Sequence, residues 1–230
     1  MVANIIYEQA YLDMELVFKD RVHAGELLAE KLRSYAGKKE TLVLAIPAGG
    51  VPVGHVLAKK LHIPFDVLII RKIQIPWNTE AGFGAVTSDD ITIFNEPLMA
   101  QLRLTKKQVE QCRSRTLEVV KERIKKLRGD APFPELVDKT VILVDDGLAS
   151  GFTMLAAVKS VRRKKAKKVV VAVPTASKSA IELVAPNVDE LICLNIRSGP
   201  IFAVADAYRN WYDLSDDEVI EILKLTSEAS

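Results

Sequence analysis

The chain of 230 residues is long enough for one large α/β domain or two small ones, and its 49% hydrophobic and 27% charged residues are ordinary for a soluble globular protein. A formal net charge of +2 argues against a general polyanion binder. No apolar run reaches the roughly 18 residues of a membrane helix, and the first ten residues lack the features of a signal peptide, so a cytoplasmic protein without membrane contact is expected. Cys112 and Cys193 are far apart in the sequence and are expected to be buried reduced thiols. The cysteines and histidines form no zinc-binding or nucleophile–histidine pattern.

The first part of the chain alternates helix and strand signals. Apolar residues near helical spacing predict a helix over Phe18 to Tyr35. A strand over Thr41 to Ile46 then leads into the glycine-containing turn Pro47 to Pro52, and Pro52 suits the first turn of the next helix. Such a strand–turn–helix unit can offer backbone N–H groups to an anion, or can need its glycines only for a tight turn. The sequence leaves both readings open.

The next predicted strand, Pro64 to Ile70, is followed at once by Arg71 and Lys72. Two cations at the carboxyl end of a strand lie where open α/β sheets bind ligands, although a solvated strand end is a common alternative. The segment Gln74 to Thr87 contains Pro76, Gly82 and Gly84 and suits a mobile cover over a site.

Two further elements precede the middle of the chain. Ala85 to Thr87 and Ile91 to Phe94 predict a hairpin. Thr105 to Arg128 is the longest predicted helix, and Thr105 with Gln108 forms a capping box at its start. Its charged face alternates in sign, which is typical of a solvated surface and not of a nucleic-acid surface.

The stretch from Val141 to Thr153 is the most ordered pattern in the chain. Its first four residues are aliphatic and predict a strand buried on both faces; Asp145 and Asp146 end that strand, and a helix is predicted from Met154 to Val161. The small and hydroxylated residues between them are Gly147, Ala149, Ser150, Gly151 and Thr153. A sharp turn into a helix points N–H groups and hydroxyls at one spot that favours a phosphate, and neighbouring carboxylates can accept hydrogen bonds from vicinal hydroxyls. This arrangement predicts a sugar-phosphate site; an acidic turn that caps a helix without a ligand is the alternative.

The last third of the chain continues the alternation. The basic run Arg162 to Lys168 ends a helix, where its charge suits the helix dipole, so RNA or DNA binding is not expected. A strand over Val169 to Pro174, a helix over Ser177 to Val184 and a strand over Glu190 to Asn195 follow. The alternation predicts a doubly wound α/β fold with a central parallel sheet.

The final segment, Arg197 to Asp213, is aromatic, and Ser215 with Glu218 caps a terminal helix. Aromatic residues there can stack on a flat base or can pack the core of the last turn. Both uses remain open from the sequence.

The stretch Val141 to Thr153 resembles the binding motif for phosphoribosyl pyrophosphate (PRPP) in type I phosphoribosyltransferases. That motif has a hydrophobic strand, two acids, two variable residues and a small hydroxylated loop ending in Thr; it lacks the spacing of a Walker A loop. Phe18 to Arg21, Ile46 to Val53 and Arg71-Lys72 are similar to a group of bacterial and archaeal phosphoribosyltransferase-like proteins. The resemblance implies a single domain over residues 1–230, with a five-stranded parallel core, a mobile hood loop at Gln74 to Thr87 and a cap from the termini.

The family implies a glycosyltransferase (a pentosyltransferase) of nucleotide metabolism that transfers the 5-phosphoribosyl group of PRPP to a nitrogenous base, with Mg²⁺ as cofactor and a homodimer as the common assembly. Carried over by position, Asp145 and Asp146 would bind the ribose hydroxyls and hold the metal indirectly, aided in catalysis by Arg71 and Lys72. The implied PRPP loop comprises Gly147, Leu148, Ala149, Ser150, Gly151, Phe152 and Thr153. The implied pyrophosphate loop comprises Ala48, Gly49 and Gly50, and the candidates for base binding are Phe202, Asp206 and Trp211.

The chain departs from the family pattern at three positions. Ala48 stands where the group commonly has Arg, Gly147 replaces a branched apolar residue, and Phe152 replaces a residue that is more often small. A missing cation at position 48 affects catalysis more than binding, because a cation on a leaving group matters most as charge develops there. An alternative function is therefore a regulatory module that binds PRPP or a nucleotide without transferase activity.

Overall fold

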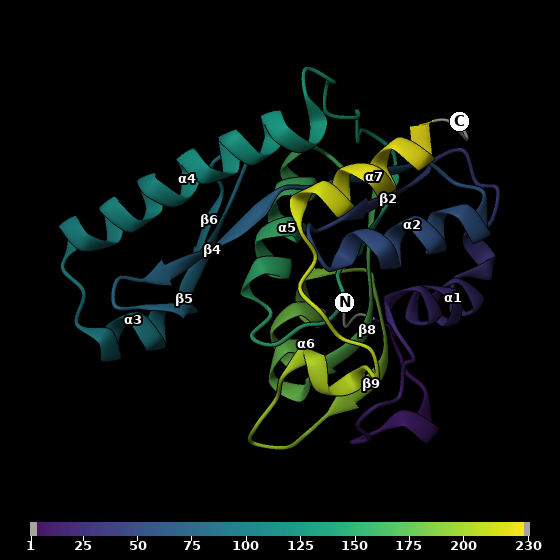
Figure 1. Cartoon of the computed structure of the whole chain (residues 1–230), viewed down its shortest axis with the longest axis horizontal. Coiled ribbons are helices and arrows are strands. Elements are labelled where there is room, and N and C mark those ends of the chain that lie inside the picture. Colours follow the sequence, from purple (N-terminus) through teal and green to yellow (C-terminus); the bar gives the residue numbers. More distant parts are fainter. Residues whose placement is uncertain (1–3, 228–230) are drawn as a thin grey trace.

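The computed structural model describes residues 4–227, and its centre is a parallel sheet of six strands in the order β1-β9-β8-β7-β2-β3 (Figure 1). The strands are β1 (Asn4–Ile6), β2 (Thr41–Ala45), β3 (Phe65–Val67), β7 (Thr140–Val144), β8 (Lys168–Ser177) and β9 (Glu190–Arg197). The predicted α/β fold with a parallel sheet flanked by helices is confirmed. The sheet has six strands instead of the expected five because β1 pairs with the edge strand β9.

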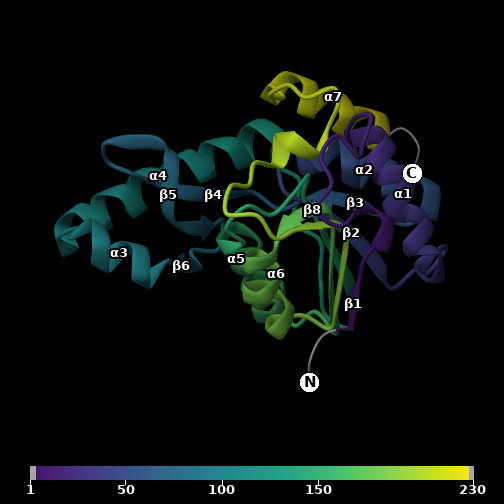
Figure 2. The same cartoon turned by 90° about the horizontal axis from the view of Figure 1, so that it is seen from below.

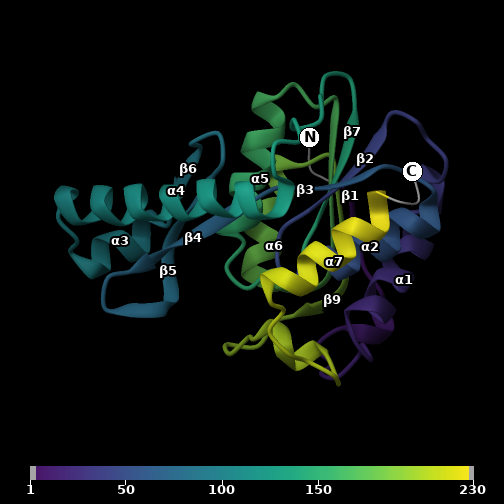
Figure 3. The same cartoon turned by 45° about the horizontal axis from the view of Figure 1, so that its top comes forward.

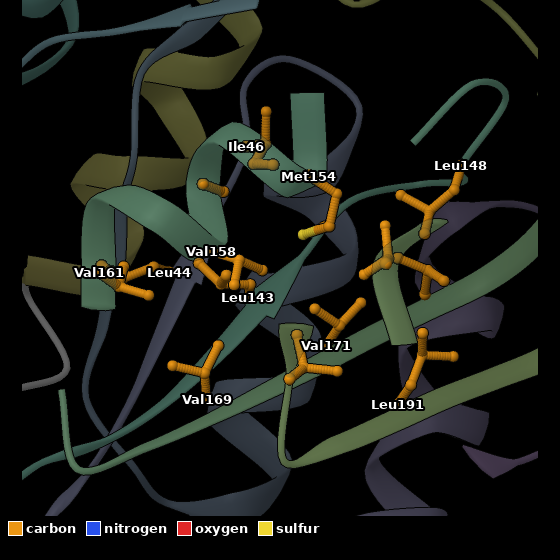
Figure 4. Close-up of a cluster of buried hydrophobic side chains, with 14 of the residues drawn as sticks. Leu44, Ile46, Leu143, Leu148, Met154, Val158, Val161, Val169, Val171 and Leu191 are labelled. Atoms are coloured by element: carbon orange, nitrogen blue, oxygen red, sulfur yellow. The ribbon is translucent and has the colours of Figure 1, made fainter. Parts of the chain in front are cut away.

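Helices cover both faces of this sheet, as Figure 2 shows. On one face lie α5 (Phe152–Arg163) and α6 (Lys178–Val184), and on the other α1 (Arg21–Lys31) and α2 (Gly50–Leu61). Neighbouring residues of each strand point to opposite faces. Leu143 and Val171 therefore join the core beneath α5 (Figure 4), whereas Ile142 and Val170 join the core beneath α1 and α2.

An arm projects from one side of the sheet (Figure 1). It consists of the antiparallel strands β4 (Ile70–Ile75), β5 (Asn78–Thr87) and β6 (Thr92–Phe94), with α3 (Glu96–Leu102) and α4 (Lys106–Arg128). The hairpin predicted before residue 95 is confirmed as β5 and β6, and the capping box of Thr105 and Gln108 is present at the start of α4.

The segment Gln74 to Thr87, predicted as a mobile hood loop, is a hairpin made of the end of β4 and the strand β5, and its mobility stays a prediction. Its glycines serve close packing between strands: a Cβ on Gly84 would lie 2.6 Å from the carbonyl oxygen of Ile93 on β6. Phe83 is fully buried, and its ring stacks on Phe94 with centroids 6.1 Å apart. The glycines of this segment therefore allow the close strand pairing of the arm.

Two other predicted elements have different limits in the structure. The strand predicted over Pro64 to Ile70 is divided into β3, which ends at Val67, and β4, which begins at Ile70, so Arg71 and Lys72 lie within the first strand of the arm. The helix predicted over Phe18 to Tyr35 is α1 plus a short 3-10 turn; Asp20 caps its N-terminus through the His23 N–H.

The expected cap from the two ends of the chain is present over the carboxyl ends of the strands. The N–H of Phe18 donates to the Ala207 carbonyl at 2.9 Å, and the N–H of Leu16 donates to the Asp206 carbonyl at 2.8 Å. The terminal helix α7 (Asp216–Ser227), capped by Ser215 and Glu218 as predicted, then lies along α2 (Figure 3). No helix within residues 4–227 is long and apolar enough to cross a membrane.

The arm is fastened to α5 through the carboxylate of Asp89. This carboxylate accepts hydrogen bonds from the hydroxyls of Thr87 at 2.7 Å and Ser160 at 2.9 Å, and from the Lys164 ammonium at 3.0 Å. Burial by itself raises the pKa of Asp89, but the hydrogen bonds from Thr87, Lys164 and Ser160 outweigh burial and lower it. The ionised carboxylate therefore stabilises the attachment of the arm.

We expect Asp89→Asn to lower the free energy of unfolding by about 1–3 kcal/mol at neutral pH, because it removes hydrogen bonds to a charged acceptor. Since the pKa of Asp89 is lowered in the folded protein, this contribution is complete above the ordinary aspartate pKa of about 3.9 and is lost as the pH falls through the folded value. Urea unfolding at several pH values measures the effect. The exposed Asp130→Asn is the control, and an equal loss in both variants would contradict the prediction.

Candidate functional site

The stretch around the acid pair folds as the sequence predicts. Strand β7 ends at Val144, Asp145 and Asp146 follow, and α5 begins at Phe152. Gly151 has a φ of +79°, a left-handed conformation that glycine adopts without strain, and this conformation turns the chain into the helix. The first turn of the helix leaves N–H groups without intrahelical acceptors next to Thr153.

The loop between the acids and α5 is pinned to the end of β8. The Leu148 N–H donates to the Thr175 carbonyl at 3.0 Å, and the Leu148 carbonyl accepts from the Ser177 N–H at 3.0 Å. The Ser177 hydroxyl also donates to the Ala149 carbonyl at 2.7 Å. Leu148, whose side chain is buried, thus holds the loop in shape, whereas Ala149 and Ser150 are exposed.

A cleft of about 270 Å³ opens between this loop and α4. Four of the predicted site residues line it: Asp145, Thr153, Arg71 and Lys72. The remaining lining residues are Ile46, Pro47, Ile70, Gln74, Arg115, Thr116 and Val119. Cations from the arm therefore face a carboxylate and a hydroxyl from the core across one cavity.

The predicted pyrophosphate loop packs directly against the acid pair. A Cβ on Gly49 would lie 1.8 Å from Oδ2 of Asp146, and a Cβ on Gly50 would lie 2.7 Å from the Val144 carbonyl oxygen. Only glycine permits this approach. The peptide bond between Pro47 and Ala48 is cis, and Ala48 itself is half-buried. The structure thus brings the two glycine-containing motifs together at one edge of the sheet.

The two acids lie in different electrostatic surroundings. Oδ1 of Asp145 accepts the Asp146 N–H at 2.9 Å, and burial together with the Asp146 charge raises the pKa of Asp145 well above its ordinary value. Burial also raises the pKa of Asp146, against the opposing effect of the Arg21 guanidinium, whose Nε lies 2.9 Å from Oδ2 of Asp146. Asp145 is therefore the acid that faces the cleft, and Asp146 is the acid that holds Arg21.

Arg21 connects the acid pair to the aromatic cap. Its Nη1 donates to the Tyr212 carbonyl at 2.9 Å, and its guanidinium lies 3.9 Å from the centroid of the Trp211 ring. The Tyr208 hydroxyl donates to the Asp146 carbonyl at 2.6 Å. The sequence pointed to Arg21 only through a short resemblance. Trp211, predicted to stack on a base, is in contact with this guanidinium through one face of its ring.

The other two candidates for base binding are occupied by contacts within the cap. The Arg197 guanidinium lies 5.3 Å from the centroid of the Phe202 ring and 3.2 Å from Oδ2 of Asp206. Asp206 also accepts the Ala203 N–H at 3.3 Å. Neither residue lines the cleft next to Asp145, so the structure does not gather Phe202, Asp206 and Trp211 into a base pocket there.

Two of the three departures from the family pattern have a structural context. A Cβ on Gly147 would lie 2.6 Å from Cγ1 of Val204, so the cap fills the space that a branched side chain would take. At position 48, the cleft beside the alanine is lined by Arg115 of α4, which sequence analysis missed. Its helical spacing showed only which face of α4 is apolar, not that the arm turns this helix toward the site.

The carboxylates near the cleft are possible ligands for a metal ion. Among residues 4–227, no group of three or more His, Cys, Asp or Glu side chains gathers to hold a metal. The carboxylates of Asp145 and Asp146 are adjacent, and Mg²⁺ commonly takes one or two carboxylates and completes its coordination with phosphates and water. These residues therefore fit a Mg²⁺ ion that arrives with a phosphate ligand.

We expect Asp145→Asn to be more stable than the wild type at about pH 8 and to lose that advantage toward about pH 4. Between the ordinary aspartate pKa and the raised folded value, the folded state binds more protons than the unfolded state, so wild-type stability falls as the pH rises. The amide oxygen can still accept the Asp146 N–H. Urea unfolding across this range tests the expectation, which a less stable variant at about pH 8 would contradict.

Comparisons with known proteins agree on one family. The model of the phosphoribosyl transferase domain matches residues 19–205. A protein of Mycobacterium tuberculosis H37Rv, provisionally described as a phosphoribosyl transferase, is 35% identical over 207 residues; these cover 90% of this chain and 46% of that protein, so the chain spans about half the length of this relative. The crystal structure of TT1426 from Thermus thermophilus has 33% identity and a TM-score of 0.73, over 90% of this chain and 98% of that one. The chain belongs to the phosphoribosyl transferase domain family.

Proposed function

We propose that this protein transfers the 5-phosphoribosyl group of PRPP to a nitrogenous base and releases pyrophosphate. The observation that carries the proposal is the meeting of the glycine loop, the acid pair and the cations of the arm around one cleft. The N-terminus of α5 suits the 5-phosphate, the carboxylates suit the ribose hydroxyls, and Arg71 with Lys72 suits the pyrophosphate.

In the proposed reaction, a bond forms between a nitrogen of the base and C1 of the ribose. The bond from C1 to the pyrophosphate oxygen breaks, pyrophosphate leaves with that electron pair, and the N–H proton of the base passes to solvent. Positive charge develops on the ribose and negative charge on the leaving group, so Asp145 and Arg71 lie where opposite charges stabilise both. A Mg²⁺ ion held beside Asp145 and Asp146 would supply further positive charge to the phosphate oxygens.

A regulatory module that binds PRPP or a nucleotide without chemistry is the second candidate. Two observations favour it: Ala48 stands where the family commonly has Arg, and Oδ2 of Asp146 already accepts from Arg21. Calorimetry with PRPP, followed by measurement of pyrophosphate release with a panel of bases, separates the candidates. Binding with base-dependent release supports the transferase, whereas binding without release for any base supports the module.

We expect Asp146→Asn and Thr153→Ala each to lower the rate of pyrophosphate release by about 100-fold, the usual cost of removing one group that stabilises developing charge or positions the substrate. Steady-state assays with PRPP and the best base of the panel measure the effect. The exposed Asp130→Asn removes a carboxylate far from the motif in sequence and is the control. A near-normal rate in either site variant would refute the assignment of that residue.

A further inference from the structure

Position 48 carries an alanine where the family commonly has an arginine, so it contributes no positive charge to the cleft. Ala48 follows Pro47, which lines the cleft, and an alanine brings no charge to a leaving pyrophosphate. The opposite wall of the same cleft belongs to α4, which contributes Arg115, Thr116 and Val119. A guanidinium therefore borders the same cavity from another element.

Arg115 differs from every other arginine of α4. Arg113 pairs with Asp90 and with Glu110, the latter at 2.7 Å. Arg123 pairs with Asp216 at 2.7 Å, and Arg128 pairs with Asp66. The exposed guanidinium of Arg115, by contrast, makes no hydrogen bond or ion pair with the residues that the structure describes.

The charged side chains around the cleft are mostly positive, which favours an anion there. Three cationic side chains, those of Arg71, Lys72 and Arg115, line it together with one carboxylate, that of Asp145. Burial and the nearby Arg123 charge lower the pKa of Arg71, and the Asp216 charge opposes them. A guanidinium presents two parallel N–H donors to phosphate oxygens, a geometry that lysine cannot offer.

We propose that Arg115 supplies from α4 the cation that position 48 lacks and binds the pyrophosphate group of the ligand. This role rests on the proposed function, and it makes the arm a part of the active site. As the bond from C1 to the pyrophosphate oxygen breaks, the guanidinium donates hydrogen bonds to the oxygens that gain charge.

The test compares Arg115→Ala with Lys121→Ala, which removes one positive charge from an exposed position of the same helix that does not line the cleft. Calorimetry with inorganic pyrophosphate gives the binding constants, and assays with PRPP give the rates. We expect Arg115→Ala to weaken pyrophosphate binding by about 10-fold or more and to lower turnover by about 100-fold. We expect Lys121→Ala to stay within about twofold of the wild type on both measures.

A rescue variant distinguishes direct binding of pyrophosphate by Arg115 from a general effect of the substitution on the protein. In the background of Arg115→Ala, the second change Ala48→Arg restores the family's usual cation, and we expect it to recover part of the lost pyrophosphate affinity. Wild-type affinity in Arg115→Ala, or an equal loss in Lys121→Ala, would overturn the inference while leaving the transferase in place. Pyrophosphate binding that depends on Arg115, without base-dependent release from PRPP, would instead overturn the transferase and keep the role of Arg115.

Discussion

The site depends on the contact between the glycine loop after β2 and the acid pair after β7. These strands are adjacent and parallel, with Ala45 opposite Val144, so the two segments that follow them leave the sheet at the same level. The Ile46 N–H then donates to the Val144 carbonyl at 2.8 Å, which keeps the two segments side by side beyond the strands. Any side chain at Gly49 would collide with Asp146. The register of two buried strands thus fixes the distance between the predicted pyrophosphate and ribose subsites.

This closeness has an electrostatic consequence. Burial and the neighbouring Asp146 charge together raise the pKa of Asp145, and the second of these effects is the repulsion between the two carboxylates. The Arg21 charge opposes the rise in pKa of both acids, but Arg21 pairs directly with Asp146, and its guanidinium lies on Trp211. Within the described residues 4–227, the carboxylate of Asp145 forms no ion pair, which suits a group that must accept hydrogen bonds from a ligand. The cost in stability at neutral pH is typical of a functional site.

The parts that could be predicted from the sequence are local. Asp145 to Thr153 are consecutive in the chain, so their strand, turn and helix signals already define their geometry. The strand pairing of Gln74 to Thr87 could not be predicted because glycine suits both a loop and a close strand contact, and only the pairing of Gly84 with β6 shows the contact. Arg21 and Arg115 were missed because each reaches the site through tertiary packing, from the first helix and from the arm, and no spacing rule connects them to the acid pair.

The arm changes how a ligand would be held. Arg71 and Lys72 lie on β4 and Arg115 on α4, so the cations of the cleft belong to the arm, whereas Asp145 and Thr153 belong to the core. In the proposed function, a PRPP molecule would bridge the two, with its ribose and 5-phosphate on the core and its pyrophosphate between the glycine loop of the core and the cations of the arm. The carboxylate of Asp89 ties the turn between β5 and β6 to α5 through Ser160 and Lys164. This attachment therefore helps to set where the cations of the arm lie relative to Asp145 and Thr153 of the core.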